Sequence, residues 1–146
     1  MQFEIITYSN KPTDNEKNKI VNFLFTHLDK YGDPIPAIEK AVNYALHEGE
    51  SFGGFIVVAY ENENIIGAVV VNKTGMKEYI PENILVYIAT HRNYRGKGIG
   101  KELMKRTIDH AEGSVALHVE AENPARFLYE KMGFQNKYVE MRLIRN

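Results

Sequence analysis

Apolar side chains in the first half of the chain recur with two different periods. Short runs rich in β-branched and aromatic residues predict strands, and stretches with an apolar side chain every three or four residues predict helices. The first helix begins after Thr13, which has Glu16 in the capping-box position, and it ends before the break at Gly32-Asp33-Pro34. The predicted order is a strand at residues 3–8, this first helix, a second helix at 35–46, and strands at 55–60 and 65–71 around a polar hairpin turn.

The second half of the chain alternates strands with helices. A polar connection at residues 72–83 leads into the apolar run 84–89, and a glycine-rich turn follows it. The remaining expected elements are a helix ended by Gly113, a strand at 115–119, a helix at 124–131 and a last strand at 137–144. A hairpin makes neighbouring strands antiparallel, whereas a strand-helix-strand unit makes them parallel. The pattern therefore predicts an α/β fold with one mixed sheet and helices on both faces.

The turn before the third predicted helix combines glycine with positive charge. Gly96, Gly98 and Gly100 stand at alternate positions, with Arg95 and Lys97 beside them. The first backbone N–H groups of a helix lack internal partners and carry the positive end of the helix dipole. Glycine lets an anion approach these groups closely, because it has no Cβ atom. The turn therefore predicts a binding site for a pyrophosphate.

Two well-known phosphate-binding motifs do not fit this turn. A P-loop requires Ser or Thr directly after Gly-Lys, but Gly98 follows Lys97. A dinucleotide fingerprint requires a third glycine where this chain has Lys101, although Glu120 stands at the end of a strand, as a ribose-binding acid would. The chain that remains after Glu120 is too short to complete a doubly wound sheet.

Length, charge and composition narrow the function further. The chain has 146 residues, the size of one domain with a single core. Its 18 basic and 19 acidic residues nearly cancel, so neither nucleic acid nor an anionic membrane is an expected partner. The chain has no cysteine, no apolar run long enough for a membrane span and no leader-like N-terminus, so we expect it to be cytoplasmic. Its histidines lack metal-ligand spacing, so no metal is expected.

Two blocks of the sequence together resemble one family. Arg95, Gly98 and Gly100 match its phosphate-binding pattern of Gln or Arg, two residues, Gly, one residue, and Gly or Ala. Residues 123–134 contain its late Asn, Ala, Tyr-Glu-Lys and Gly-Phe signature. In these motifs and their order the chain is similar to the Gcn5-related N-acetyltransferase (GNAT) superfamily. The C-terminal part matches closely, and the N-terminal half matches only in the order of its elements.

The resemblance implies the acyl-CoA N-acyltransferase fold, in which the strands on either side of the glycine turn splay apart. It implies that the opening between them holds the cosubstrate acetyl-CoA, whose acetyl group is transferred by direct attack to a primary amine of a small molecule or a protein. Asn123 is expected to bond the pantetheine amide. All residues expected at acetyl-CoA are Ile88, Thr90, Arg95, Gly96, Lys97, Gly98, Ile99, Gly100, Lys101, Asn123, Phe127 and Tyr129.

The same resemblance assigns catalytic roles. The backbone N–H of Ile88 is expected to bond the acetyl carbonyl, and Tyr129 is expected to protonate the leaving thiolate. An alkyl amine has a pKa of about 10.4 and must lose a proton before it attacks. Related protein acetyltransferases carry a glutamate four residues before the Ile88 position, where this chain has Ile84. Glu82, acting through water, is therefore a candidate base.

Further polar residues are candidates for the acceptor side. Glu120 and Glu122 follow a strand and are alternative groups for binding or deprotonating a cationic amine, and His118 lies on the polar face of that strand. A carboxylate rim that would favour a cationic acceptor is expected from Asp29, Asp33, Glu39, Glu48, Glu50 and Glu78. A nucleotide-binding module and a non-catalytic CoA-binding regulator remain alternatives to the enzyme, and a homodimer through the last strand is left open.

Overall fold

The chain forms one mixed sheet whose strands lie in sequence order. The computed structural model describes residues 1–146 and contains five strands in the order β1-β2-β3-β4-β5. They are β1 (Gln2–Ile6), β2 (Gly54–Glu61), β3 (Asn64–Lys73), β4 (Asn83–Thr90) and β5 (Val115–Leu117). Neighbouring strands are antiparallel except β4 and β5, which are parallel. The predicted mixed sheet is confirmed.

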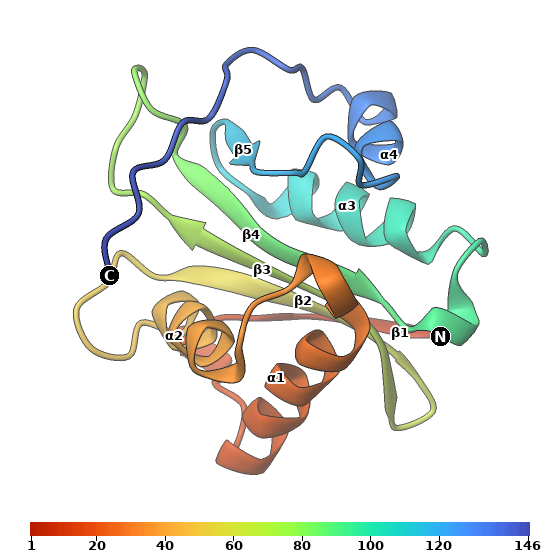
Figure 1. The fold of residues 1–146 in the computed structure, drawn as a ribbon. Helices are drawn as coiled ribbons and strands as arrows, with labels where there is room; N and C mark the ends of the chain where they lie inside the picture. Colours follow the sequence, from red (N-terminus) through yellow and green to blue (C-terminus); the bar gives the residue numbers. More distant parts are fainter.

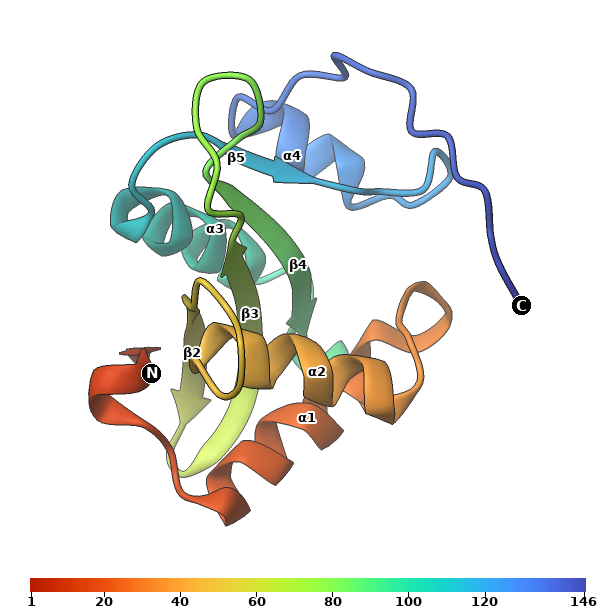
Figure 2. The same cartoon turned by 90° about the vertical axis from the view of Figure 1, so that its left-hand side faces the viewer.

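Helices cover both faces of this sheet. They are α1 (Asp14–Leu28), α2 (Ile35–Ala45), α3 (Ile99–His110) and α4 (Arg126–Lys131), with short 3-10 turns η1 (Tyr8–Asn10), η2 (Asp29–Tyr31) and η3 (Arg92–Tyr94). α1 and α2 lie against one face of the sheet, and α3 and α4 lie on the other side (Figure 1). Figure 2 shows the same layers from the side. None of these helices has the length and apolar character needed to cross a membrane.

Alternating side chains of the central strands supply a separate core on each face. On β2, Ile56 and Val58 pack with α1 and α2, whereas Phe55 and Val57 pack with α3 and α4. All four side chains are almost fully buried. Because both faces are covered, the central strands have continuous apolar sequences instead of alternating ones.

β4 breaks this alternation at Val86. Its pairing with β3 joins Leu85 to Val71 and Tyr87 to Val70, so Val86 is an extra residue that forms a β-bulge. As a result Leu85 packs on the face covered by α3, but Tyr87 packs on the face covered by α1. The bulge thus turns the second half of β4 over relative to the first.

β5 accompanies β4 only as far as this bulge. The paired residues are Asn83 with Val115, Ile84 with Ala116 and Leu85 with Leu117. Beyond Leu117 the segment that follows β5 diverges from β4, so residues 86–90 of β4 have no partner in β5. The strand predicted at 115–119 is shorter for this reason, because a strand ends where its neighbour turns away. The splayed sheet implied by the family resemblance is confirmed.

One predicted strand is absent, and the predicted end of the first strand is wrong. Residues 137–144 form no strand, and their apolar side chains are largely exposed (Figure 1). Alternating apolar and polar residues indicate a segment that could form a strand. A strand also needs a neighbouring strand for its backbone hydrogen bonds, and the local sequence does not show whether one is present. The first strand, predicted at 3–8, ends at Ile6, because the Thr7 side chain caps the 3-10 turn η1 and diverts the chain.

Candidate functional site

The glycine turn ends at the N-terminus of α3. Gly98 is the N-cap residue with a φ of 82°, and Gly96 has a φ of 78°, both in the left-handed region that favours glycine. A Cβ atom added at either glycine would meet no other atom within 4 Å. The turn is thus open beside the first N–H groups of a helix, which is an arrangement suited to phosphate.

Arg95 lies in this turn and is bonded to two other segments. Its guanidinium donates to the backbone oxygen of Thr90 at 3.3 Å and to that of His27 at 2.9 Å. His27 lies in the last turn of α1, where the helix dipole favours a cation. Arg95 therefore ties the glycine turn to α1, a contact that the sequence did not predict. Lys97 lies 5.2 Å from the centroid of the Tyr94 ring.

Two cavities open at the wedge between β4 and β5. The larger cavity has a volume of about 520 Å³, and the smaller cavity has a volume of about 290 Å³. The smaller one extends to Thr90, Arg95 and Gly100 at the glycine turn. Residues that line both are Leu28, Tyr31, Ile88, Asn123 and Tyr129. The two cavities therefore meet beside Ile88 and Tyr129, the two residues for which the family resemblance implied catalytic roles.

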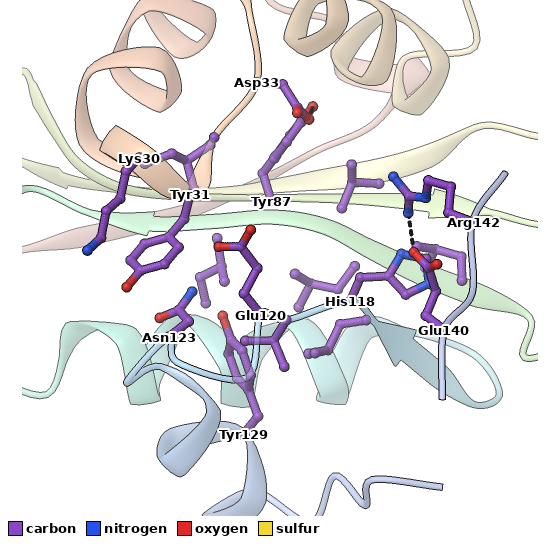
Figure 3. A pocket seen from close by; sticks show the side chains of 18 residues that line it. Lys30, Tyr31, Asp33, Tyr87, His118, Glu120, Asn123, Tyr129, Glu140 and Arg142 are labelled. Atoms are coloured by element: carbon purple, nitrogen blue, oxygen red, sulfur yellow. Dashed lines mark hydrogen bonds and ion pairs between the residues drawn. The ribbon is translucent and has the colours of Figure 1, made fainter. Parts of the chain in front are cut away.

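Tyr129 is a nearly buried tyrosine at this junction. It lies on α4, is 8% exposed, and has its ring centroid 6.1 Å from that of Phe134. Figure 3 shows its hydroxyl directed into the larger cavity. Burial raises the pKa of Tyr129 to about 12. Its hydroxyl is therefore protonated at neutral pH and can act as a hydrogen-bond or proton donor.

Asn123 is fixed by the start of α4. Its Oδ1 atom accepts a hydrogen bond from the backbone N–H of Ala125 at 2.9 Å. This bond orients the carboxamide so that its oxygen is engaged locally, and the residue lines both cavities. The Nδ2 atom remains as the group that can donate to a ligand.

A tyrosine and a carboxylate meet in the larger cavity. The Tyr87 hydroxyl donates to Oδ2 of Asp33 at 2.6 Å. Burial, together with the hydrogen bond to Asp33 and its negative charge, raises the pKa of Tyr87 far above its usual range. Sequence reasoning missed Tyr87, because a regular strand at residues 84–89 gives no sign of the bulge at Val86 that turns this side chain toward Asp33.

The segment after β5 supplies further polar groups. His118 and Glu120 line the larger cavity, and the Glu120 carboxylate points into it (Figure 3). Glu140 and Arg142 of the C-terminal segment are hydrogen-bonded to each other and line the same cavity. Glu122, the other carboxylate suggested by the sequence after this strand, does not line it.

The structure places other expected acidic residues away from the cavities. Glu82 precedes β4, and its carboxylate accepts a hydrogen bond from the backbone N–H of Ser114 at 3.3 Å. Glu48 forms an ion pair with Lys17 at 3.5 Å. Among the six carboxylates of the expected rim, only Asp33 lines either cavity, and residues 72–83 contribute nothing to the lining.

Only some of the residues expected to contact acetyl-CoA line a cavity. Thr90 and Gly100 line the smaller cavity. The Ile99 side chain is 3% exposed and packs in the core, so only its backbone is available to a ligand. Phe127 is 65% exposed, and neither it nor Lys101 lines a cavity.

The splayed sheet, the open glycine turn and the buried tyrosine agree with the fold and motifs that the resemblance to the GNAT superfamily implied. A family model described as "Acetyltransferase (GNAT) domain" matches residues 52–136, which is more than half of the chain. The chain therefore belongs to the GNAT acetyltransferase family. Among the curated proteins compared with it, none matches.

Solved structures share this fold over nearly the whole chain. Ribosomal-protein-alanine N-acetyltransferase from Brucella melitensis biovar Abortus 2308 has a TM-score of 0.67 at 17% identity, covering 100% of this chain and 99% of that one. An aminoglycoside acetyltransferase from an uncultured soil metagenomic sample, in complex with sisomicin, has a TM-score of 0.63 at 15% identity, covering 99% and 96%. The NatC complex bound to Gag peptide and CoA contains a chain with a TM-score of 0.66 at 23% identity, covering 94% and 87%. At these identities the likeness is one of fold.

Proposed function

We propose that this chain is an N-acetyltransferase that moves an acetyl group from acetyl-CoA to a primary amine, with both bound at once. One observation carries the proposal. The smaller cavity, which begins at the glycine turn, and the larger cavity, which contains the carboxylates, meet at Ile88 and Tyr129. A donor in one cavity and an acceptor in the other would bring their reacting groups together at this junction.

The glycine turn and the residues around the smaller cavity fit acetyl-CoA. Gly96 and Gly98 leave room for a pyrophosphate beside the first N–H groups of α3. Gly100 lines this cavity and has no side chain to occupy it. The pantetheine arm would follow the side of β4 that β5 leaves unpaired, with Nδ2 of Asn123 as a donor. When bound, acetyl-CoA supplies a thioester whose carbonyl carbon is open to attack.

The chain's own groups then control charge and protons. As the amine nitrogen forms a C–N bond, the C–S bond breaks and the sulfur leaves with its electron pair. The Ile88 N–H donates to the carbonyl oxygen where negative charge develops. Tyr129 gives its proton to the departing sulfur, since its buried hydroxyl is protonated at neutral pH. After attack, the remaining extra proton on nitrogen passes to the Tyr129 phenolate oxygen, which restores the hydroxyl.

Glu120 is the group in this proposal that takes the first proton from the amine. An alkylammonium ion has a pKa of about 10.4, so it needs a base near neutral pH. The Glu120 carboxylate points into the larger cavity, which Tyr129 also lines (Figure 3). Asp33, held by the Tyr87 hydroxyl, adds a second negative charge. These two carboxylates favour a cationic acceptor.

Structures that share the fold are named with bound molecules of different kinds. An aminoglycoside acetyltransferase is in complex with sisomicin, and the NatC complex is bound to Gag peptide and CoA. These names support an amine as the acceptor class, from either a small molecule or a protein.

The test is to measure thiol release from acetyl-CoA with a polyamine, an aminoglycoside and a peptide with a free N-terminus, and to detect the N-acetyl product by mass spectrometry. We expect thiol release that requires one of these amines. Coenzyme binding without turnover on any amine would support a non-catalytic regulator instead. Stabilisation by NAD or ATP in place of acetyl-CoA would support a nucleotide-binding module.

Glu120 and Glu122 form a matched pair for testing the base, because they lie two residues apart and only Glu120 lines the cavity. Glu120→Gln should lower kcat at pH 7 by about 100-fold, the scale of general base catalysis, and lose less at pH 9, where more of the amine is already neutral. Glu122→Gln should leave kcat within about twofold, since its side chain is outside the reaction site. Equal effects of the two substitutions would exclude Glu120 as the base.

A further inference from the structure

Two histidines stack where α1 meets the turn that leads to α3. The ring centroids of His27 and His91 are 4.2 Å apart with an interplanar angle of 36°. Phe23 lies on His27 at 4.6 Å, and the Tyr94 ring meets His91 edge-on at 5.5 Å. This stack joins a helix on one side of the sheet to the segment that begins the glycine turn.

Both imidazoles accept hydrogen bonds from the backbone of that segment. Nδ1 of His27 accepts from the N–H of Arg92 at 3.3 Å, and Nδ1 of His91 accepts from the N–H of Asn93 at 3.1 Å. A ring nitrogen can accept only while it carries no proton. The observed contacts therefore belong to neutral rings with their proton on Nε2.

The stack is connected directly to the smaller cavity. The Arg95 guanidinium donates to the backbone oxygen of His27 at 2.9 Å, and both residues line that cavity. From Arg95 the chain continues through Gly96 and Gly98 to the N-terminus of α3. The residue that contacts the stack, Arg95, is thus only a few residues from the N–H groups proposed to hold pyrophosphate.

The charged groups that face His27 are all basic. Burial, followed by the nearby His91, Arg92 and Arg95, lowers the pKa of His27. The other residues that line the smaller cavity contribute no carboxylate, and its remaining titratable groups are the tyrosines Tyr31 and Tyr129. A proton on the ring would therefore find no negative partner there.

We propose that the His27–His91 stack positions the glycine turn for coenzyme binding, and that protonation of the His27 ring releases the turn and weakens the binding of CoA. The inference rests on the proposed use of acetyl-CoA. Protonation of His27 at Nδ1 converts an acceptor into a donor that faces the backbone N–H of Arg92, so that hydrogen bond is lost. The new positive charge also lies near the guanidinium groups of Arg92 and Arg95. His27 and His91 are positioning residues in this proposal, because they act through the turn.

The test is calorimetric titration of the whole protein with CoA at pH 8 and at pH 5.5, comparing wild type with the His27→Asn/His91→Asn double variant. Asn can place an uncharged oxygen acceptor near the position of Nδ1. CoA itself titrates, since a phosphate has a second pKa of about 6, but this effect is common to both proteins. His110→Asn serves as the control, because His110 lies at the far end of α3 against Phe55.

We expect wild type and the control to lose about tenfold more affinity than the double variant on acidification, the equivalent of losing one or two hydrogen bonds. Parallel profiles for all three proteins would overturn the proposal. So would a relative gain of affinity by wild type at pH 5.5, which would make imidazolium a phosphate ligand. Failure of wild type to bind CoA at pH 8 would instead refute the proposed function.

A second measurement covers the case in which the double variant does not fold. In wild-type protein, NMR would follow the His27 ring and the amides of Arg92 and Asn93 during a pH titration. We expect the amide signals to move with the same midpoint as the ring. Amides that do not respond to ring protonation would overturn the proposal.

Discussion

Tyr129 and Tyr87 are two tyrosines of the wedge whose raised pKa values have different causes. Burial alone raises the pKa of Tyr129, whereas burial and the partner Asp33 together raise that of Tyr87. Both hydroxyls remain protonated at neutral pH, but only that of Tyr129 lies at the junction of the two cavities. The first is therefore suited to proton donation and the second to holding a carboxylate in place.

Replacing Tyr129 with Phe should lower kcat by about 100-fold or more while the KM for acetyl-CoA changes by less than about threefold, because the hydroxyl acts on the departing sulfur. The measurement is steady-state thiol release at pH 7.5. Tyr44→Phe is the control, since its hydroxyl bonds the backbone oxygen of Lys73 outside both cavities. An unchanged kcat in Tyr129→Phe would mean that water protonates the thiolate.

The Tyr87–Asp33 hydrogen bond should contribute more to stability than the Tyr44–Lys73 one. The first joins a hydroxyl to a carboxylate at 2.6 Å, and the second joins a hydroxyl to a neutral carbonyl at 2.7 Å. In urea unfolding at pH 7, Tyr87→Phe should cost about 1.5–3 kcal/mol and Tyr44→Phe about 1 kcal/mol. Equal costs of the two substitutions would contradict this assignment.

At the scale of elements, the site arises where β4 changes partners. The bulge at Val86 lies next to the last pair between β4 and β5, Leu85 with Leu117. It directs Tyr87 toward Asp33 and leaves Ile88 at the junction of the cavities. The strand and the turn that follows it were predicted from the sequence. The bulge was not, because an extra residue is visible only against the neighbouring strand.

Gly98 and Gly49 offer a matched test of the turn. Both have positive φ, 82° and 75°, and a Cβ atom at either would meet nothing within 4 Å. Substitution by Ala should therefore destabilise each variant by about 1–2 kcal/mol through backbone strain alone. Only Gly98→Ala should also weaken the binding of CoA, because Gly98 is the N-cap of α3, beside the N–H groups proposed to hold the pyrophosphate. Urea unfolding and calorimetric titration would measure the two effects, and equal CoA affinity in both variants would show that the turn does not hold the coenzyme.

At the scale of the whole molecule, the two cavities span both layers. Leu28 and Tyr31 reach them from the end of α1 and the turn η2, and Asn123 and Tyr129 reach them from the segment of α4. A ligand in the cavities would contact both the α1–η2 region and the α4 segment, which lie on opposite sides of the sheet (Figure 1). Coenzyme binding should therefore stabilise the fold as a unit.

Acetyl-CoA at 100 times its dissociation constant should add about 2.7 kcal/mol of stability, since it binds only the folded state. For a chain of this size the midpoint of thermal unfolding should rise by roughly 5–10 °C. NAD and ATP at the same concentration are the controls and should give smaller shifts. A larger shift with either nucleotide would favour the nucleotide-binding alternative.

The sequence by itself determined the local features of this protein. Helical and strand periods, the Thr13 cap and the alternate glycines at 96, 98 and 100 specify elements and a glycine-rich turn before α3, because each depends on residues close together in the chain. The tertiary structure alone decided which distant groups meet. Tyr87 bonds Asp33 across 54 residues, and Arg95 bonds His27 across 68. It also decided that residues 137–144 have no ladder partner. Such contacts depend on the packing of whole layers, which local periodicity does not contain.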